Sequence, residues 1–360
     1  MDQQSELELK RREVSEKILS FKRKIAPSLT VETFGKILPR RISSRSLLYW
    51  MIIVILLNLV MWIPGLLVSR ILGEPAWDSA IWLAWFVGVQ TCTFALLTSH
   101  FALQDVLDEL AARVIHKITN TKDLDEFLQW MYSSWNLMNI IGIVILYCGL
   151  WVIFGVGGIS NARGEFVGFG PTITATIGGI LLGIAANYVI WLTFLPRRLA
   201  NYSYDLNIVD PARSEIINVL ENMFNKHLYI TASYFGVATL VISFIKLTSV
   251  TFPLILLGWL IIILQFLINR YATTKIIDTA KWKILNNLQE QINHLVKSQD
   301  LSEKESAEKL LRLTEIYERI AISKSNRFDL KSLSTFVSQL MLPLLGLLLG
   351  NLEKVSALLR

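Results

Sequence analysis

Six stretches of the sequence consist almost entirely of apolar residues. An α-helix rises about 1.5 Å per residue, so roughly 20 residues cross a hydrocarbon layer about 30 Å thick. None of the six stretches has a charged residue near its middle, whereas a surface helix of a soluble protein would carry a charged stripe. The pattern predicts an all-α polytopic membrane protein with six transmembrane helices in three hairpins. The predicted spans run approximately from Leu47 to Ser69, Trp77 to Ser99, Trp135 to Gly157, Pro171 to Leu195, Leu228 to Leu247 and Thr251 to Asn269.

The longer connections repeat apolar residues every three or four positions, as amphipathic helices do. Phe101–Ile118 is expected to form one helix after the second span. Asp123 and Glu126 are spaced like a capping pair, and we expect them to start the helix that leads into the third span. Asp210 is followed by Pro211, which predicts a helix from Pro211 to Asn225 before the fifth span.

After the sixth span the pattern predicts a helical hairpin. Apolar positions continue at helical spacing to Leu295, and Ser302 with Glu305 forms a capping box that opens a second helix. The last apolar stretch, Phe336–Gly350, is too short to span and is interrupted by proline and glycine. It is expected to be interfacial, re-entrant or buried in an oligomer, with a seventh span as the alternative.

These elements divide the chain into four parts. Residues 1–46 are expected to form a cytoplasmic basic segment, and 47–272 a six-helix transmembrane domain with helical loops at 101–134 and 196–227. Residues 273–330 are expected to form a cytoplasmic helical hairpin, and 331–360 an apolar interfacial or oligomerisation segment.

Composition and charge agree with a membrane protein. Only 18% of the residues are charged, against about a quarter in soluble domains, and the mean hydropathy is +0.47. Of the 35 Lys and Arg residues, 32 fall on the side of the spans that carries the longer connections and both termini. Basic connections stay in the cytoplasm, so we expect both termini there, in a plasma (inner) membrane. The basic residues do not form one continuous face, which weighs against nucleic acid as a partner.

No sequence motif indicates an enzyme, a metal site or a bound cofactor. Cys92 and Cys148 lie in apolar runs, where thiols behave as small hydrophobic groups. The four histidines show no metal-ligand spacing, and there is no phosphate loop or nucleophile elbow. Asp105, Asp108 and Glu109 are expected to form the solvated face of a helix.

The string from Val167 to Gly170 resembles the selectivity filter of potassium channels, in which backbone carbonyls replace the hydration shell of the ion. The residue before it is Phe166 where a filter has threonine, and the preceding residues are typical of a loop rather than of a pore helix. We therefore interpret the two glycines as a turn into the fourth span.

Neutral polar residues within the spans fall into stripes at helical spacing. One interpretation is that some stripes line an aqueous pathway, and the other is that they mediate helix packing. No Asp, Glu, Lys or Arg lies in the central part of a span, which weighs against an ion-coupled carrier. The candidate pore-lining residues are Gln90, Thr93, His100, Asn139, Thr172, Thr176, Asn187, Gln265 and Asn269.

The first functional hypothesis is therefore a passive channel for ions or small solutes. Apart from the lipid bilayer, its expected partners are further copies of the same chain, joined through the cytoplasmic helices and the C-terminal segment. The alternative is a membrane scaffold or signalling protein whose cytoplasmic helices bind a partner. A carrier for neutral or lipidic molecules is the third hypothesis.

Overall fold

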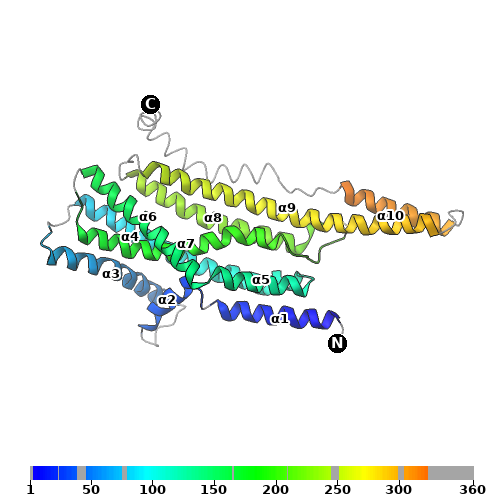
Figure 1. Ribbon diagram of the computed structural model, residues 1–360, viewed down its shortest axis with the longest axis horizontal. Coiled ribbons are helices and arrows are strands. Elements are labelled where there is room, and N and C mark those ends of the chain that lie inside the picture. The colour runs from blue at the N-terminus through cyan, green and yellow to red at the C-terminus, as the bar shows by residue number, and fades with distance from the viewer. Residues whose placement is uncertain are drawn as a thin grey trace, which may run out of the picture.

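The computed structural model of the chain describes residues 3–22, 24–38, 46–74, 79–163, 166–208, 210–244, 251–298 and 304–322 (Figure 1). These residues form helices, and their single extended pairing is a bridge between Ile118 and Tyr204. The predicted all-α class is confirmed, and the C-terminal stretch Phe336–Gly350 lies outside the described residues. The α-helices are α1 (Gln3–Phe21), α2 (Ala26–Lys36), α3 (Leu47–Ile71), α4 (Ser79–Glu109), α5 (Thr121–Ser134), α6 (Leu137–Arg163), α7 (Phe169–Leu199), α8 (Glu215–Phe244), α9 (Thr251–Ser298) and α10 (Lys304–Ile322).

Four of the described helical stretches are long and apolar enough to cross a membrane. A fifth candidate is the pair α5 and α6, which is bent by 46° at its break. Five of the predicted spans coincide with helices over their described residues, and the third begins two residues later, because Trp135 and Asn136 form the break before α6. The side chains of α8 beyond Gly236 and residues 245–250 lie outside the described part. The count of six spans therefore stays a prediction. The four stretches are Leu47–Ile71, Trp85–Lys117, Phe169–Leu199 and Gly258–Lys297.

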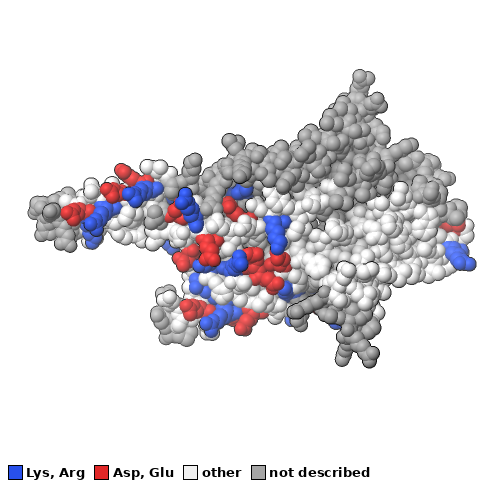
Figure 2. Space-filling model, turned by 180° about the vertical axis from the view of Figure 1, so that it is seen from behind, with Lys and Arg blue, Asp and Glu red and all other residues white. Residues whose placement is uncertain are grey.

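Charged side chains gather at one end of the molecule, which we call the charged end (Figure 2). A broad band of uncharged surface, the apolar band, separates the charged end from a small charged tip on the opposite side (Figure 2). The helices α1, α5 and α10 and the C-terminal part of α9 lie at the charged end (Figure 1). The structure thus has the division into an uncharged layer and a charged layer that a membrane protein requires.

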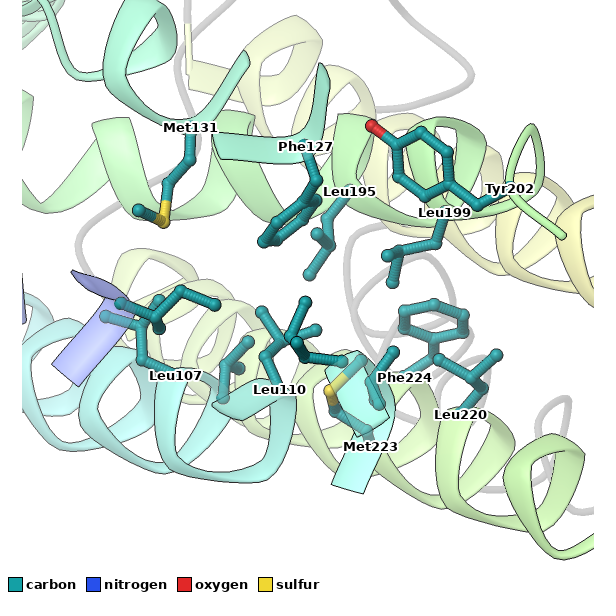
Figure 3. Packing of buried hydrophobic residues seen from close by; sticks show 14 of the residues in the cluster. Leu107, Leu110, Phe127, Met131, Leu195, Leu199, Tyr202, Leu220, Met223 and Phe224 are labelled. Carbon is teal, nitrogen blue, oxygen red and sulfur yellow. The ribbon is translucent and has the colours of Figure 1, made fainter. Parts of the chain in front are cut away.

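One hydrophobic core holds the charged end together (Figure 3). Phe127 of α5 and Leu195 of α7 point toward Leu110 at the end of α4 and toward Phe224 of α8. Residues of α1 and α9 complete the same core. Each fully buried side chain of this size stabilises the fold by about 1.5–3 kcal/mol. The helices of the apolar band therefore continue into a common helical module.

One regular helix was predicted to continue to Ile118, but the segment after α4 is irregular. A π-helical turn at Leu110–Val114 and a 3₁₀ turn at Ile115–Lys117 follow Glu109. A π turn breaks the regular backbone hydrogen bonding. The hydroxyl of Ser15 in α1 donates to the Ala111 carbonyl at 2.9 Å, and the Arg11 guanidinium donates to the Ile118 carbonyl at 2.7 and 2.9 Å. The first helix of the N-terminal segment, α1, thus binds this irregular stretch.

Two predicted helix starts are also corrected. The cap of α5 is Asn120, whose side chain accepts from the Lys122 N–H at 3.0 Å. Asp123 lies in the first turn and instead accepts from the Ser203 N–H at 2.9 Å, because the connection before α8 folds back beside it. Asp210 and Pro211 open only a 3₁₀ turn, and α8 begins at Glu215.

The longest helix, α9, continues from the apolar band into the charged end without a break. Its 48 residues correspond to about 72 Å at the α-helical rise. The C-terminal part of α9 packs against α10 in antiparallel fashion, and Lys281 donates to the Ala321 carbonyl at 2.8 Å. We call this pair the α9–α10 arm (Figure 1). It lies within 273–330, where a helical hairpin is predicted, and residues 299–303 and 323–330 of that range lie outside the described part.

Candidate functional site

The nine side chains proposed to line a pore fall into groups with different neighbours. Gln90, Thr93 and His100 belong to α4, and Asn139 belongs to α6. Thr172, Thr176 and Asn187 belong to α7, and Gln265 and Asn269 belong to α9. The contacts of each group show whether its residues mediate helix packing or are free to line an aqueous pathway.

The α4 group connects α4 to two neighbouring helices. Gln90 donates to the side-chain oxygen of Asn58 in α3 at 2.6 Å. His100 lies 3.3 Å from the hydroxyl of Ser28 in α2, which also accepts from Gln104. Thr93 is buried, and its hydroxyl has no hydrogen-bond partner in the described structure. Two of the three residues therefore join helices to one another.

The α7 stripe forms the contact between α7 and α6. A Cβ atom on Gly179 would lie 2.9 Å from the Cys148 Cα, and one on Gly183 would lie 2.7 Å from the Val144 Cα. Small residues at four-residue spacing let two helix backbones approach this closely. The hydroxyl of Thr176, on the same stripe, donates to the Thr172 carbonyl at 2.8 Å. This arrangement favours helix packing as the role of Thr172 and Thr176.

The contact between α7 and α3 is equally close at the end of the band away from the charged end. A Cβ on Gly65 would lie 2.6 Å from the Gly170 carbonyl oxygen, and one on Gly170 would lie 2.5 Å from the Gly65 carbonyl oxygen. Glu74 follows α3 and caps the first turn of α7. Its carboxylate accepts from the Ser69 hydroxyl at 2.7 Å and from the N–H groups of Phe169 and Gly170 at 2.5 and 3.2 Å.

This cap explains the string that resembles a potassium filter. Gly168 has φ +108° and directly precedes α7, so it forms the expected turn, whereas Gly170 already lies in the first turn of the helix. A Cβ at Gly168 would lie 2.8 Å from a Glu74 oxygen. Partial burial acts to raise the pKa of Glu74, but the three hydrogen bonds together outweigh burial and hold the pKa below its ordinary value.

The α9 group is buried and poorly paired. Gln265 is fully buried, and neither its amide nitrogen nor its amide oxygen has a partner in the described structure. The side-chain oxygen of Asn269, one turn later, is also buried and has no partner among the described residues. Thr273, a further turn along, donates to the Asn269 carbonyl at 3.2 Å. Buried polar atoms of this kind usually meet ordered water in proteins.

A groove between α5, α6 and α7 brings two of the predicted residues together. Asn139 and Asn187 both line this groove, which has a volume of ≈ 410 Å³. Trp130 and Trp191 also line it, and their rings stack with centroids 5.7 Å apart. The bend between α5 and α6 sets the groove where the apolar band meets the charged end. Its remaining lining residues are Ser134, Met138, Gly142, Ile143, Ile190 and Phe194.

No family model, no curated protein and no solved structure matches the chain. The function of these sites is therefore argued from their geometry and chemistry.

A second polar junction joins α4, α7 and α8. The hydroxyl of Tyr188 lies 2.9 Å from His227 Nδ1, and His227 Nε2 lies 3.5 Å from an Asp105 carboxylate oxygen. Lys226 binds the same oxygen at 2.7 Å. Tyr188 and His227 are buried, whereas Asp105 reaches the surface. The sequence pattern gives no sign of this junction, because its members come from three distant helices.

The three acidic side chains of α4 are partly exposed, as a solvated face would be, and they also form ion pairs. Asp105 binds Lys226 of α8, and Asp108 binds Lys22, just after α1, at 2.6 Å. Only Glu109 pairs within its own helical region, with Arg113. The described residues contain no group of three or more His, Cys, Asp or Glu side chains that could hold a metal ion. The charged end is therefore held together by ion pairs around a hydrophobic core.

Proposed function

We propose that the chain is a plasma (inner) membrane protein with six spans in three hairpins and with its charged end and both termini in the cytoplasm. The clustering of 32 of the 35 basic residues on one side supports this orientation. The four to five described candidate spans and the uncharged band support the membrane position. The orientation is tested by the variant Thr314→Cys in α10, labelled with a thiol reagent in intact and in lysed cells. Labelling in intact cells would contradict it.

We further propose that the protein is a homo-oligomeric membrane scaffold that presents the α9–α10 arm to the cytoplasm. The observation that carries this proposal is the apolar surface of the arm. Trp282 of α9 and Leu311 of α10 are each 63% exposed, although the arm lies outside the apolar band. Exposed large apolar side chains outside the membrane are typical of protein interfaces. We assign a second copy of the chain as the partner that covers them.

Light scattering of the purified protein in detergent tests the scaffold proposal. Leu311→Arg places a charge in the proposed interface and is expected to weaken self-association at least about tenfold, since burying one leucine contributes about 1.5–3 kcal/mol. Ser20→Arg is the matched control, because Ser20 is an exposed polar residue of α1, which is not part of the arm. The proposal would be refuted if the wild-type protein is monomeric, or if the two variants form oligomers of the same size and stability.

A passive channel is the second candidate function, and the unpaired side chains of α9 favour it. Gln265 and Asn269 would be hydrated if a file of water followed this face of the helix. We expect Gln265→Leu to reduce any conductance recorded in planar bilayers, because it removes two hydrogen-bonding atoms from the path. Wild-type protein that conducts nothing under voltage, calcium, changed pH or membrane tension would exclude the channel and leave the scaffold in place.

A further inference from the structure

We propose that the groove between α5, α6 and α7 binds one anionic phospholipid of the cytoplasmic leaflet. The proposal goes beyond the scaffold function and rests on the proposed orientation of the chain only for the assignment of the leaflet. Three features of the groove carry the argument: its position, its lining and a free arginine at its end.

The first feature is the position of the groove. On α6, Met138 is 74% exposed, and Phe194 on α7 is 53% exposed, so both helices present apolar surface beside the groove. On α7, the residues after Phe194 are Leu195, Pro196, Arg197 and Arg198, which bring the charged end to the same place. A ligand in the groove would therefore touch both the apolar band and the charged end. A phospholipid, with acyl chains and a charged headgroup, has this division.

The second feature is the chemistry of the lining. None of the lining residues is charged. Asn139 donates to the Ser133 carbonyl at 3.0 Å, and Asn187 donates to the Gly183 carbonyl at 2.8 Å. Each amide group keeps a second N–H and its oxygen for a ligand. The two asparagines can thus meet the ester region of a lipid, while Ile143, Ile190 and the stacked tryptophans contact its chains. A volume of ≈ 410 Å³ lies within the usual range of ligand pockets, about 300–1,000 Å³.

The third feature is Arg197. It follows Phe194 by three residues and Ile190 by seven, so it lies one turn beyond the groove on the same side of α7. Its side chain is exposed, and no described residue forms a hydrogen bond or ion pair with it. The neighbouring Arg198 is engaged with Glu126 and Tyr202. An unpaired arginine beside a groove without acidic residues fits a phosphate group, which its planar guanidinium can bind in bidentate fashion.

Two glycines of α6 provide a matched test of the groove. A Cβ atom on Gly142 or on Gly149 would meet nothing within 4 Å, so a larger side chain fits at both positions. Gly142 lines the groove, whereas Gly149, two turns further along α6, does not. Gly142→Phe is expected to fill the groove, and Gly149→Phe is the control. Arg197→Gln tests the headgroup contact, with Arg213→Gln as its control, because Arg213 is an exposed arginine on the connection before α8.

The measurement is native mass spectrometry of the full chain in detergent, titrated with phosphatidylglycerol or with phosphatidylcholine of the same acyl chains. We expect the wild type to prefer phosphatidylglycerol. Arg197→Gln is expected to reduce that preference about fivefold, the usual effect of one basic residue near an anionic lipid, and Arg213→Gln to leave it unchanged. Gly142→Phe is expected to weaken binding of both lipids at least about tenfold relative to Gly149→Phe.

Equal lipid binding by Gly142→Phe and Gly149→Phe would overturn the proposed site, and an unchanged preference in Arg197→Gln would overturn the headgroup contact. Light scattering of the same samples separates this result from the scaffold proposal, since lipid binding can fail while self-association persists. Because the titration uses purified protein, it does not depend on the orientation of the chain in the cell. Circular dichroism shows whether each variant is folded. The arginine variants change only surface residues, so they test the site even if Gly142→Phe does not fold.

Discussion

The close contact between α6 and α7 predicts opposite effects for the same substitution at two glycines. At Gly183 of α7, an alanine Cβ would lie 2.7 Å from the Cα and 3.1 Å from the carbonyl oxygen of Val144. These are backbone atoms, so the clash is relieved only if the two helices separate. At Gly149 of α6, a Cβ would meet nothing within 4 Å.

The magnitudes follow from two competing effects. Alanine stabilises a helix by about 0.5–1 kcal/mol relative to glycine, because it restricts the unfolded chain. Overpacking typically costs about 1–3 kcal/mol, and the separation of α6 from α7 also weakens the neighbouring contact at Gly179. Gly183→Ala is therefore expected to destabilise the protein by about 1–2 kcal/mol. Gly149→Ala is expected to stabilise it by up to about 1 kcal/mol.

Thermal unfolding in detergent, followed by tryptophan fluorescence at one heating rate, measures both variants against the wild type. The expected result is a melting temperature a few degrees lower for Gly183→Ala and equal or higher for Gly149→Ala. A Gly183→Ala protein that melts at or above the wild-type temperature would show that the helices do not meet at this point. An equal loss in both variants would show that glycine is required in these helices for another reason.

Three further predictions concern the cap, the junction and the core. Glu74→Gln is expected to lower stability at pH 7 by about 1–3 kcal/mol, because a neutral amide replaces a carboxylate that accepts three hydrogen bonds. The pKa of Glu74 is depressed in the folded chain, so this contribution is present above the unfolded pKa near 4.5 and is lost as the pH falls through the lower folded value. Melting curves of variant and wild type should therefore converge in acid, and a constant difference would contradict the role of the carboxylate. Tyr188→Phe leaves the buried His227 Nδ1 without its hydrogen-bond partner and is expected to lower stability by about 1–3 kcal/mol in the same assay. An unchanged melting temperature would contradict the junction. Phe224→Ala removes a ring from the core of the charged end and is expected to cost about 3–5 kcal/mol, whereas Phe86→Ala, at a 54% exposed position of the apolar band, should cost far less. Similar losses in both phenylalanine variants would contradict the assignment of the core.

The helices follow from the sequence because their signals are local. A run of apolar residues such as Leu47–Ile71 satisfies its backbone hydrogen bonds within itself, so its length and composition are sufficient to predict it. The irregular end of α4 was missed because Ser15 binds the π turn at Leu110–Val114 and Arg11 binds Ile118 just after it, and both lie about a hundred residues earlier. Asp123 was misassigned as a cap for the same reason, since its partner is Ser203. Contacts between distant segments leave no periodic pattern in the sequence.

The candidate site was predictable only in part. Asn139 and Asn187 belong to separate stripes, and their position in one groove depends on the bend at the α5–α6 break. Neither the stacking of the Trp130 and Trp191 rings nor their place in the groove has a sequence signal. The role of Arg197 is visible only once Arg198 is seen to be engaged with Glu126.

The way polar groups are used within the apolar band points to where function resides. Thr172, Thr176 and Asn187 each donate to a carbonyl four residues earlier in their own helix, which leaves the α7 surface free for close packing. The hydroxyl donors of Thr172 and Thr176 are satisfied within α7, and the glycines of the same stripe pack against the α6 backbone, so this stripe favours assembly of the bundle over passage through it. Arg197 and the second N–H groups of Asn139 and Asn187, by contrast, have no partner among the described residues, and all three lie at or beside the groove where the band meets the charged end. Ligand binding at this boundary therefore requires no rearrangement of the bundle, whereas a pathway through the contact of α6 and α7 would require those helices to separate.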